Sequence, residues 1–196
     1  MTTVVGLDLS LRATGIAVID HPDQASTPNM PRLHTVGENG RRNAATLDRA
    51  KRLSRTAKKV LAHVPEQPAL AVIEGPAFAS HHGAAHERSG LYWTVIMALG
   101  ARRIPVAVCP PATLKRYATG TGAADKTQVL DAMRHHWTTA HITNDNESDA
   151  LALATAGAMR LQWWPPETDH HETALAAIEW PTGLTDTLAT RLQEVW

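Results

Sequence analysis

The stretch VVGLDLSLRATGIAVID, residues 4–20, places one carboxylate, Asp8, inside an otherwise apolar strand. Val and Ile are frequent on both sides of a Ser-Leu-Arg turn, and this pattern predicts a hairpin of two neighbouring strands. A charge that is buried in a sheet is costly unless a hydrogen-bonding partner or a metal ion compensates it. Asp8 is therefore the first candidate for a functional residue.

The rest of the chain alternates strands with helices. A third short strand is expected at residues 33–38, and the apolar run ALAVIEG, residues 69–75, is typical of a central strand that is buried on both faces. IPVAVC, residues 104–109, predicts one more strand. Helices are expected at about residues 43–62, 87–102, 111–117, 125–136 and 146–161. This order predicts an α/β fold in which helices cover a sheet.

Length and charge indicate one main domain with an acidic extension. A chain of 196 residues suffices for one well-buried domain, which we place at residues 1–161. Basic residues outnumber acidic ones by 18 to 13 in residues 1–162, whereas residues 163–196 hold one basic residue and six acidic residues. We therefore predict an acidic, Trp-containing C-terminal extension at residues 162–196, which packs locally or on a partner.

Cysteine usage and hydropathy indicate the environment of the protein. The single cysteine, Cys109, excludes an intramolecular disulfide and a zinc site built from cysteines, and it suits a reducing compartment. No apolar run approaches the roughly 20 residues that a membrane-spanning helix needs, and the N-terminus lacks a basic signal segment. We therefore expect a cytoplasmic protein with no membrane partner.

A net charge of zero argues against a uniformly basic nucleic-acid binder, but basic residues crowd one predicted helix. This segment contains one acid, Asp48, and eight basic residues: Arg41, Arg42, Arg49, Lys51, Arg52, Arg55, Lys58 and Lys59. Two interpretations stay open: a solvated helix face, which is the usual meaning of such a run, and a surface that faces phosphates. In the second interpretation Lys58 and Lys59 bind DNA.

Three carboxylates stand where predicted elements begin or end: Asp8, Glu74 and Asp149. If they converge, their mutual repulsion favours hard divalent cations such as Mg²⁺ or Mn²⁺. A pair of such ions ~3.5–4 Å apart activates water and stabilises the leaving oxygen of a phosphodiester. Each acid also has a structural alternative, since Asp8 could cap the turn, Glu74 could pair with a basic side chain, and Asp149 could favour the start of its helix.

Four segments in this order resemble RuvC-type Holliday junction resolvases: GLDLSLRATGIAVI, AVIEGPAF, ATLKRYATGTGAADKTQV and NDNESDALALA. The resemblance covers about residues 4–161. It implies an RNase H-like α/β fold with a five-stranded mixed sheet flanked by helices and followed by a C-terminal tail. It also implies a homodimer whose two metal-dependent active sites cut symmetric strands of a four-way DNA junction.

The resemblance carries the acidic metal ligands and catalytic residues over to Asp8, Glu74 and Asp149. A fourth family acid falls on Asn146, which offers a neutral carbonyl oxygen and removes one negative charge from the site. Asn146 is therefore predicted to be a weaker metal ligand, with Asp145 in reserve on the same helix face. Two Mg²⁺ or Mn²⁺ ions per active site are expected.

Lys115 and Lys126 flank a turn that contains Gly120 and Gly122, where backbone can approach a phosphate closely. Lys126 falls in the first turn of its predicted helix, which is unfavourable for a cation, so a function explains it better than surface solubility does. In the resembled family these lysines approach the DNA and the scissile phosphate. We therefore predict that both bind DNA and that Lys126 also takes part in catalysis.

Phe78, the only phenylalanine, lies in a loop of small residues after Glu74. It either folds into the core or stacks on an unpaired base of the DNA, and the two interpretations are equally favoured. Arg88, near several histidines, is predicted to contact DNA or simply to lie on the surface. Trp93 lies on the helix that the resembled family uses for dimerisation, although core packing alone would also explain it.

These features predict a metal-dependent endonuclease that cleaves branched DNA, with a Holliday junction as the expected substrate. The compact chain would suit a phage-type member of the resembled family. Asn146 keeps open a non-catalytic or weakly catalytic junction-binding protein, and a broader nuclease for forks and flaps is a further alternative. An ATPase fragment would need a second lobe, and a ribonuclease would prefer an RNA–DNA hybrid.

Overall fold

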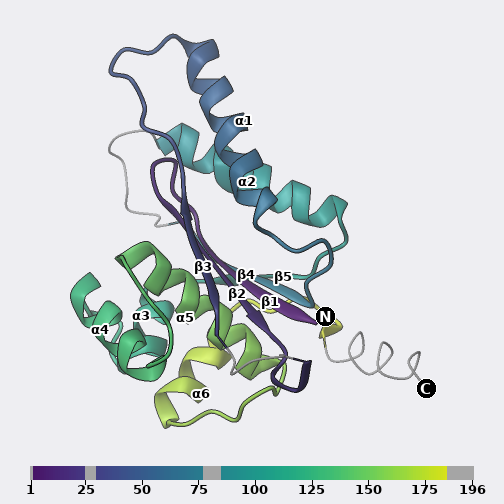
Figure 1. Ribbon diagram of the computed structural model, residues 1–196, viewed down its shortest axis with the longest axis vertical. Coiled ribbons are helices and arrows are strands. Elements are labelled where there is room, and N and C mark those ends of the chain that lie inside the picture. Colours follow the sequence, from purple (N-terminus) through teal and green to yellow (C-terminus); the bar gives the residue numbers. More distant parts are fainter. Residues whose placement is uncertain (1, 25–29, 77–84, 185–196) are drawn as a thin grey trace.

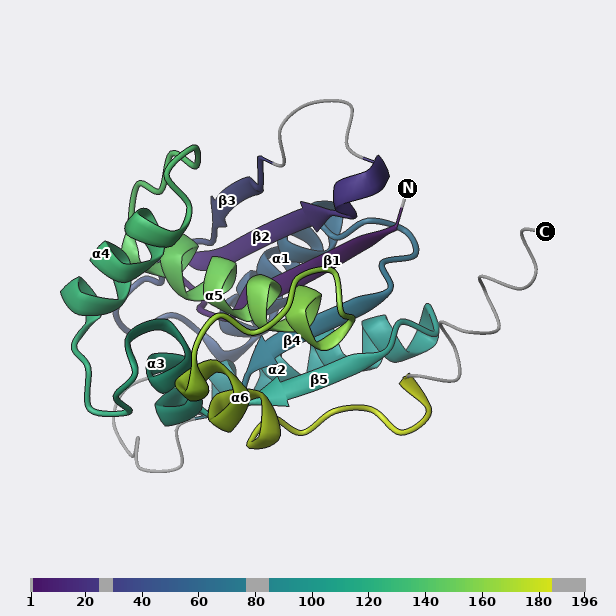
Figure 2. The ribbon, with the colours of Figure 1, turned by 90° about the horizontal axis from the view of Figure 1, so that it is seen from below.

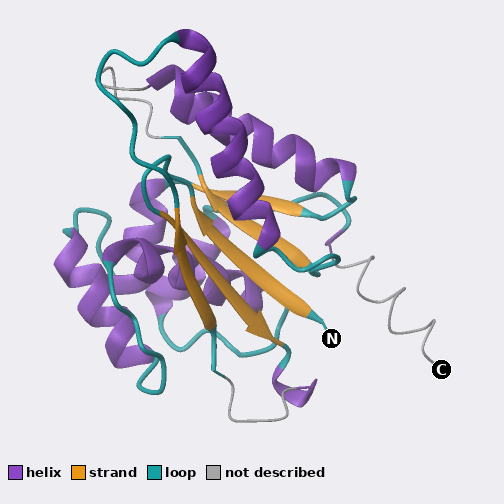
Figure 3. Cartoon of the chain, turned by 45° about the horizontal axis from the view of Figure 1, so that its top comes forward, coloured by secondary structure: helices purple, strands orange, loops and turns teal. Residues whose placement is uncertain are grey.

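The computed structural model describes residues 2–24, 30–76 and 85–184. Its strands form one five-stranded sheet in the order β3-β2-β1-β4-β5, shown in orange in Figure 3. β1 pairs antiparallel with β2 and parallel with β4, which confirms the predicted mixed sheet. The strands are β1 (Thr3–Asp8), β2 (Thr14–Asp20), β3 (Arg32–Val36), β4 (Leu70–Glu74) and β5 (Val106–Cys109).

The helices lie in two layers, one on each face of the sheet (Figure 1). One layer consists of α1 (Thr46–Ala62) and α2 (Ala85–Ala101). The other contains the remaining α-helices: α3 (Pro111–Thr119), α4 (Lys126–His136), α5 (Asp145–Arg160) and α6 (Asp169–Ala176). A short 3-10 helix, η1 (Pro22–Gln24), follows β2. Among the described helices, none is both long and apolar enough to cross a membrane.

Alternating side chains of the central strands build two separate apolar cores. Leu7 and Ile73 belong to the core beneath α1 and α2. Val4 and Val72 belong to the core beneath α5. This division follows from the two-residue period of a strand, and it fixes which face of the sheet each later residue of β1 and β4 points toward.

α5 rests directly on β1 and β2, as Figure 2 shows, because two strand positions are glycines. A Cβ atom at Gly6 would lie 2.0 Å from the carbonyl oxygen of Ala150, and one at Gly15 would lie 1.8 Å from that of Asn146. Only glycine permits so close an approach between helix backbone and strand. The start of α5 is thereby held against the end of β1.

The described part of the predicted extension, residues 162–184, packs on the rest of the molecule. Val108 of β5 and Glu179 exchange two backbone hydrogen bonds of 3.0 Å, so the extension covers part of the outer edge of the sheet. Trp163, Trp164 and Trp180 pack against the core beneath α5. The division of the chain at residue 161 stays a prediction.

Candidate active site

Asp8 and Glu74 are the last residues of two adjacent parallel strands, β1 and β4. The register pairs Leu7 with Ile73, so the next residue of each strand stands at the same level of the sheet. Because Leu7 and Ile73 point toward α1 and α2, the alternation of the strands directs Asp8 and Glu74 to the opposite face, where α5 lies. The two carboxylates therefore meet at one edge of the sheet.

The first turns of α5 bring further polar side chains to this edge. Asn144 caps the helix by accepting a hydrogen bond of 3.0 Å from the backbone N–H of Glu147. The amide of Asn146 is satisfied when its nitrogen faces Asp8, where it donates to Oδ2 at 3.2 Å and to the carbonyl oxygen of Ala13 at 3.0 Å. Asp149 follows Asn146 by three residues and shares its helix face.

The three carboxylates influence one another electrostatically. Burial, and after it the charge of Asp8, raises the pKa of Asp149 to about 7. Burial is also the largest cause of the raised pKa of Asp8 and of Glu74, whose carboxyl groups are hydrogen-bonded to each other. Without a cation, the acids therefore hold protons at a pH at which exposed carboxyls are ionised.

Two lysines counter part of this negative charge. Lys126 forms an ion pair with Asp145 and also acts to lower the pKa values of Asp8, Glu74 and Asp149. Lys115, on α3, acts in the same direction on Glu74 and Asp149.

The contact with Asp145 gives Lys126 a structural partner that explains a cation at the start of α4. It also engages the carboxylate of Asp145, which was the reserve metal ligand of the sequence-based hypothesis.

The set of donors fits a hard divalent cation. Carboxylate and amide oxygens are the ligands that Mg²⁺ and Mn²⁺ favour. Burial and, after it, the neighbouring acids raise the pKa values of the three carboxyl groups, and a bound cation would favour their ionised form. Within the described residues, no three Asp, Glu, His or Cys side chains are gathered closely enough to hold an ion as they stand. The acids share an edge of the sheet and would have to draw together around the ion.

The structure does not support the alternative in which Asp8 caps the turn after β1. The turn after Asp8 is closed by Ser10 and Thr14: the backbone N–H of Ser10 donates to Thr14 Oγ1 at 2.9 Å, and Thr14 Oγ1 donates to the Ser10 carbonyl oxygen. Within the described residues Asp8 makes no hydrogen bond to this turn, and its carboxyl group contacts Glu74 and Asn146 instead. Glu147 turns away, because its carboxylate accepts hydrogen bonds from Thr143 and from Thr35 of β3.

The other predicted DNA-binding residues lie away from the acids. Lys58 and Lys59 are exposed on α1, which covers the opposite face of the sheet, and Lys59 donates to the carbonyl oxygen of Gly37 at 3.3 Å. Arg88 lies near the start of α2 in the same layer. Phe78 lies outside the described residues.

Sequence reasoning missed the two glycines that set the height of α5 above the sheet. Gly6 stands between Val5 and Leu7, and Gly15 stands just before the apolar run of residues 16–19; an isolated glycine in a strand is a signal of close backbone approach. The missing information was the partner, since the sequence does not say which helix comes close. The structure identifies it as the segment that carries Asn146 and Asp149.

Comparisons with known proteins agree with this arrangement. Residues 4–157 match the family described as "Crossover junction endodeoxyribonuclease RuvC". A relative of that name from Acidobacterium capsulatum is 27% identical over 127 residues, which are 64% of this chain and 74% of the relative. Another, from a Synechococcus species, is 30% identical over 162 residues, or 79% of this chain and 96% of the relative.

Solved structures show the same fold. Thermus thermophilus RuvC aligns with a TM-score of 0.61 at 21% identity. The alignment covers 82% of this chain and 97% of the Thermus chain. The Fowlpox virus resolvase, solved with substrate Holliday junction DNA, aligns with a TM-score of 0.56 at 13% identity, over 82% of this chain and 99% of its own. At these identities the likeness concerns the fold, and it confirms the prediction of an RNase H-like architecture.

Proposed function

Because the chain belongs to the RuvC family of crossover junction endodeoxyribonucleases, we propose that it resolves four-way DNA junctions by hydrolysing phosphodiester bonds. Members of this family are divalent-metal-dependent nucleases of recombination and repair. The observation that carries the proposal to particular residues is the position of Asp8, Glu74 and Asp149 near one edge of the sheet, where burial and the charges of the neighbouring acids raise their pKa values. Burying such a group of acids lowers the stability of a fold. Strongly shifted pKa values of this kind are concentrated at functional sites.

We assign the metal site to Asp8, Glu74 and Asp149, with Asn146 beside them as a neutral fourth donor. Two ions, Mg²⁺ or Mn²⁺, are proposed for each site. When bound, they supply an activated water and neutralise charge on the phosphate. The chain itself contributes partly buried carboxylates that have few competing partners, and it holds them on two strand ends and one helix.

We propose that Lys115 and Lys126 bind the reacting DNA strand. Both exert a positive potential on the acids. The turn between them contains Gly120, whose φ of 82° ends α3 in a conformation that favours glycine. A phosphate that approaches the acids therefore meets two ammonium groups, and Lys126 would share its charge between Asp145 and that phosphate.

We further propose that the protein acts as a homodimer. Trp93 and Met97 are 59% and 64% exposed and follow each other by one turn on α2, which leaves an apolar strip on the surface. A twofold interface there would present two equivalent active sites to a junction that is itself nearly twofold symmetric. We also propose a cytoplasmic location, where the protein would act on DNA, and we propose that residues 162–196 form an extension of the nuclease domain.

The decisive experiment incubates the purified protein with an end-labelled four-way junction, a fork and a plain duplex, with and without Mg²⁺ or Mn²⁺. We expect metal-dependent cuts in the junction and far fewer in the duplex. Asp8→Asn and Glu74→Gln should each abolish cleavage while junction affinity changes little. Cleavage by the Asp8→Asn protein, or loss of folding in both variants, would contradict the assignment.

Asn146 supports one competing function, that of a junction-binding protein without nuclease activity. Its amide nitrogen donates to Asp8, so the side chain satisfies a carboxylate in place of a fourth acid. The same incubation decides between the two functions. Tight junction binding without any metal-dependent cleavage would favour the binding protein.

A further inference from the structure

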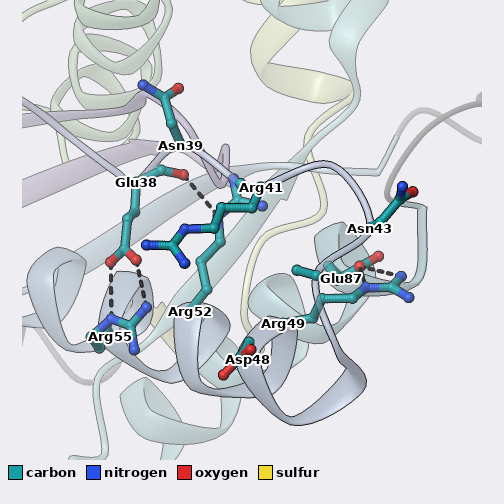
Figure 4. A pocket seen from close by; sticks show the side chains of 11 residues that line it. Glu38, Asn39, Arg41, Asn43, Asp48, Arg49, Arg52, Arg55 and Glu87 are labelled. Atoms are coloured by element: carbon teal, nitrogen blue, oxygen red, sulfur yellow. Dashed lines mark hydrogen bonds and ion pairs between the residues drawn. The ribbon is translucent and has the colours of Figure 1, made fainter.

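A pocket of about 570 Å³ lies on the surface between the segment that follows β3, the first turns of α1 and the start of α2. Its polar lining is rich in guanidinium groups, which come from Arg41, Arg49, Arg52 and Arg55 (Figure 4). The catalytic acids do not line this pocket. The concentration of arginines needs an explanation, because four like charges around one hollow repel each other.

Two of the four arginines are already neutralised by acids in the pocket wall. Arg55 forms a two-pronged ion pair with Glu38, with hydrogen bonds of 2.5 and 3.0 Å, and Arg49 pairs with Glu87 (Figure 4). Such paired guanidinium groups are held in place and contribute little net charge.

The other two arginines keep donors available. Arg52 donates from Nε to the carbonyl oxygen of Glu38 at 2.8 Å, which fixes its guanidinium plane. Neither of its Nη atoms has a hydrogen-bond partner among the described residues, and the side chain of Arg41 has no hydrogen bond or ion pair within that same part of the chain. A Cβ atom at Gly40 would lie 2.6 Å from Arg52 Nη1, so glycine makes room for this group.

The charge of the pocket suits a single phosphodiester. Besides Glu38 and Glu87, the lining contains one more acid, Asp48, so the four arginines leave a surplus of about one positive charge. A phosphodiester carries one negative charge, and a planar guanidinium with free Nη donors binds phosphate oxygens in a geometry that lysine does not offer.

The pocket is connected to the edge of the sheet that carries the acids. Arg12, in the turn that follows Asp8, donates from Nε to Asn39 Oδ1 at 3.2 Å, and Asn39 lines the pocket. The backbone N–H of Glu38 also donates to the carbonyl oxygen of Leu11 at 2.9 Å. The turn at residues 9–13 therefore joins the acids to the pocket wall, and a DNA arm that leaves the acids over this turn would reach the pocket.

We propose that Arg41 and Arg52 bind one backbone phosphate of a junction arm, at a distance from the scissile bond, and thereby orient that arm. The inference rests on the proposed junction-resolving function and adds to it a second, non-catalytic contact with the substrate. A contact of this kind positions the DNA and carries no base sequence information.

The test is a scan of neutral methylphosphonate groups along the strands of a four-way junction, with binding measured in the Asp8→Asn protein. One position on an arm should weaken binding when it is neutralised. In the Arg41→Gln/Arg52→Gln protein, junction affinity should fall about tenfold with a shallower salt dependence, and neutralising that same phosphate should have no further effect. Arg102→Gln, an exposed arginine at the far end of α2, serves as the matched control and should reproduce the original scan.

Arg41→Gln alone controls for a disturbed loop, since the side chain of Arg41 makes no hydrogen bond or ion pair with the other described residues. If every neutralised phosphate has the same effect in the parent and in both pocket variants, the inference is overturned while the nuclease proposal stands. If the protein with Asp8 intact neither binds nor cuts the junction, the inference and the nuclease proposal both fail.

Discussion

The Asp149 carboxyl occupies a place where its charge is costly. Burial and Asp8 raise its pKa to about 7, so the folded protein binds this proton more tightly than the unfolded chain does. The stability linked to that proton is fully present below the ordinary pKa of an aspartate, near 4, and is lost as the pH rises through about 7. The metal-free protein should therefore become less stable over this interval.

Asp149→Asn removes the titrating group and should raise the melting temperature of the metal-free protein at pH 8. The free energy of unfolding should increase by roughly 1–3 kcal/mol at that pH, and the difference should shrink toward pH 5. Scanning calorimetry at several pH values in a chelating buffer measures both effects. Glu66→Gln, at an exposed site, is the control, and an unchanged stability of Asp149→Asn at pH 8 would contradict the cost assigned to this charge.

Asn146 offers a test of the missing fourth acid. Asn146→Asp restores one negative charge beside Asp8 and removes the amide donor that now satisfies it. We expect cleavage to be preserved or increased, with half-maximal activity at a lower Mg²⁺ concentration, because an added carboxylate strengthens cation binding. Asn146→Ala should require more Mg²⁺ than the parent protein. A well-folded but inactive Asn146→Asp protein would show that the amide itself is needed.

At the level of single residues, the sequence located Asp8, Glu74 and Asp149 at the ends of elements, and the structure brings all three to one edge. The direction of the Asn146 amide was beyond sequence reasoning, because it depends on contact between the backbone of α5 and Gly15. The contact between Lys126 and Asp145 was also missed, since these residues belong to different helices.

At the level of elements, the distance between α5 and the sheet sets how close Asp149 lies to Asp8 and Glu74. Gly15→Ala would place a methyl group 1.8 Å from the carbonyl oxygen of Asn146, so the helix must move away from β2. We expect a loss of roughly 3 kcal/mol or more in the free energy of unfolding, together with loss of cleavage, because overpacking and displacement act at the same place. Urea unfolding measures the loss of stability.

Gly100→Ala is the matched control for this substitution. A Cβ atom at Gly100 has no neighbouring atom within 4 Å, and the residue lies in a helix, where alanine is favoured by about 1 kcal/mol. Gly100→Ala should therefore leave the protein equally or more stable. If Gly15→Ala were as harmless, the direct contact between α5 and the sheet would not support the site.

The sequence was sufficient to predict the order of the strands and helices, but it did not predict all of their boundaries. Periodicity predicted the order of strands and helices from residue 4 to residue 161, and the structure has that order. The third strand was expected to reach residue 38 but ends at Val36, which pairs with Thr14, the first residue of β2. α6 was not predicted in the extension, although Thr168 caps its first turn as a threonine at that position commonly does.

At the scale of the whole molecule, DNA cleavage and self-association are assigned to different surfaces. The acids lie at one edge of the sheet toward α5, whereas the exposed apolar strip lies on α2 in the opposite layer (Figure 1). Such a separation allows two copies to associate through α2 while both acidic edges stay open to DNA.

This arrangement predicts that assembly and chemistry can be separated by mutation. Trp93→Glu/Met97→Glu places two charges on the strip and should yield a monomer in light scattering, while metal binding by the acids is retained. Leu47→Glu, at an apolar residue that is 64% exposed on α1, should leave the assembly unchanged. On a junction, the monomeric protein should make single nicks, because paired cuts on symmetric strands require two active sites in one complex. If the double variant stays dimeric and still makes paired cuts, the dimer must form through another surface.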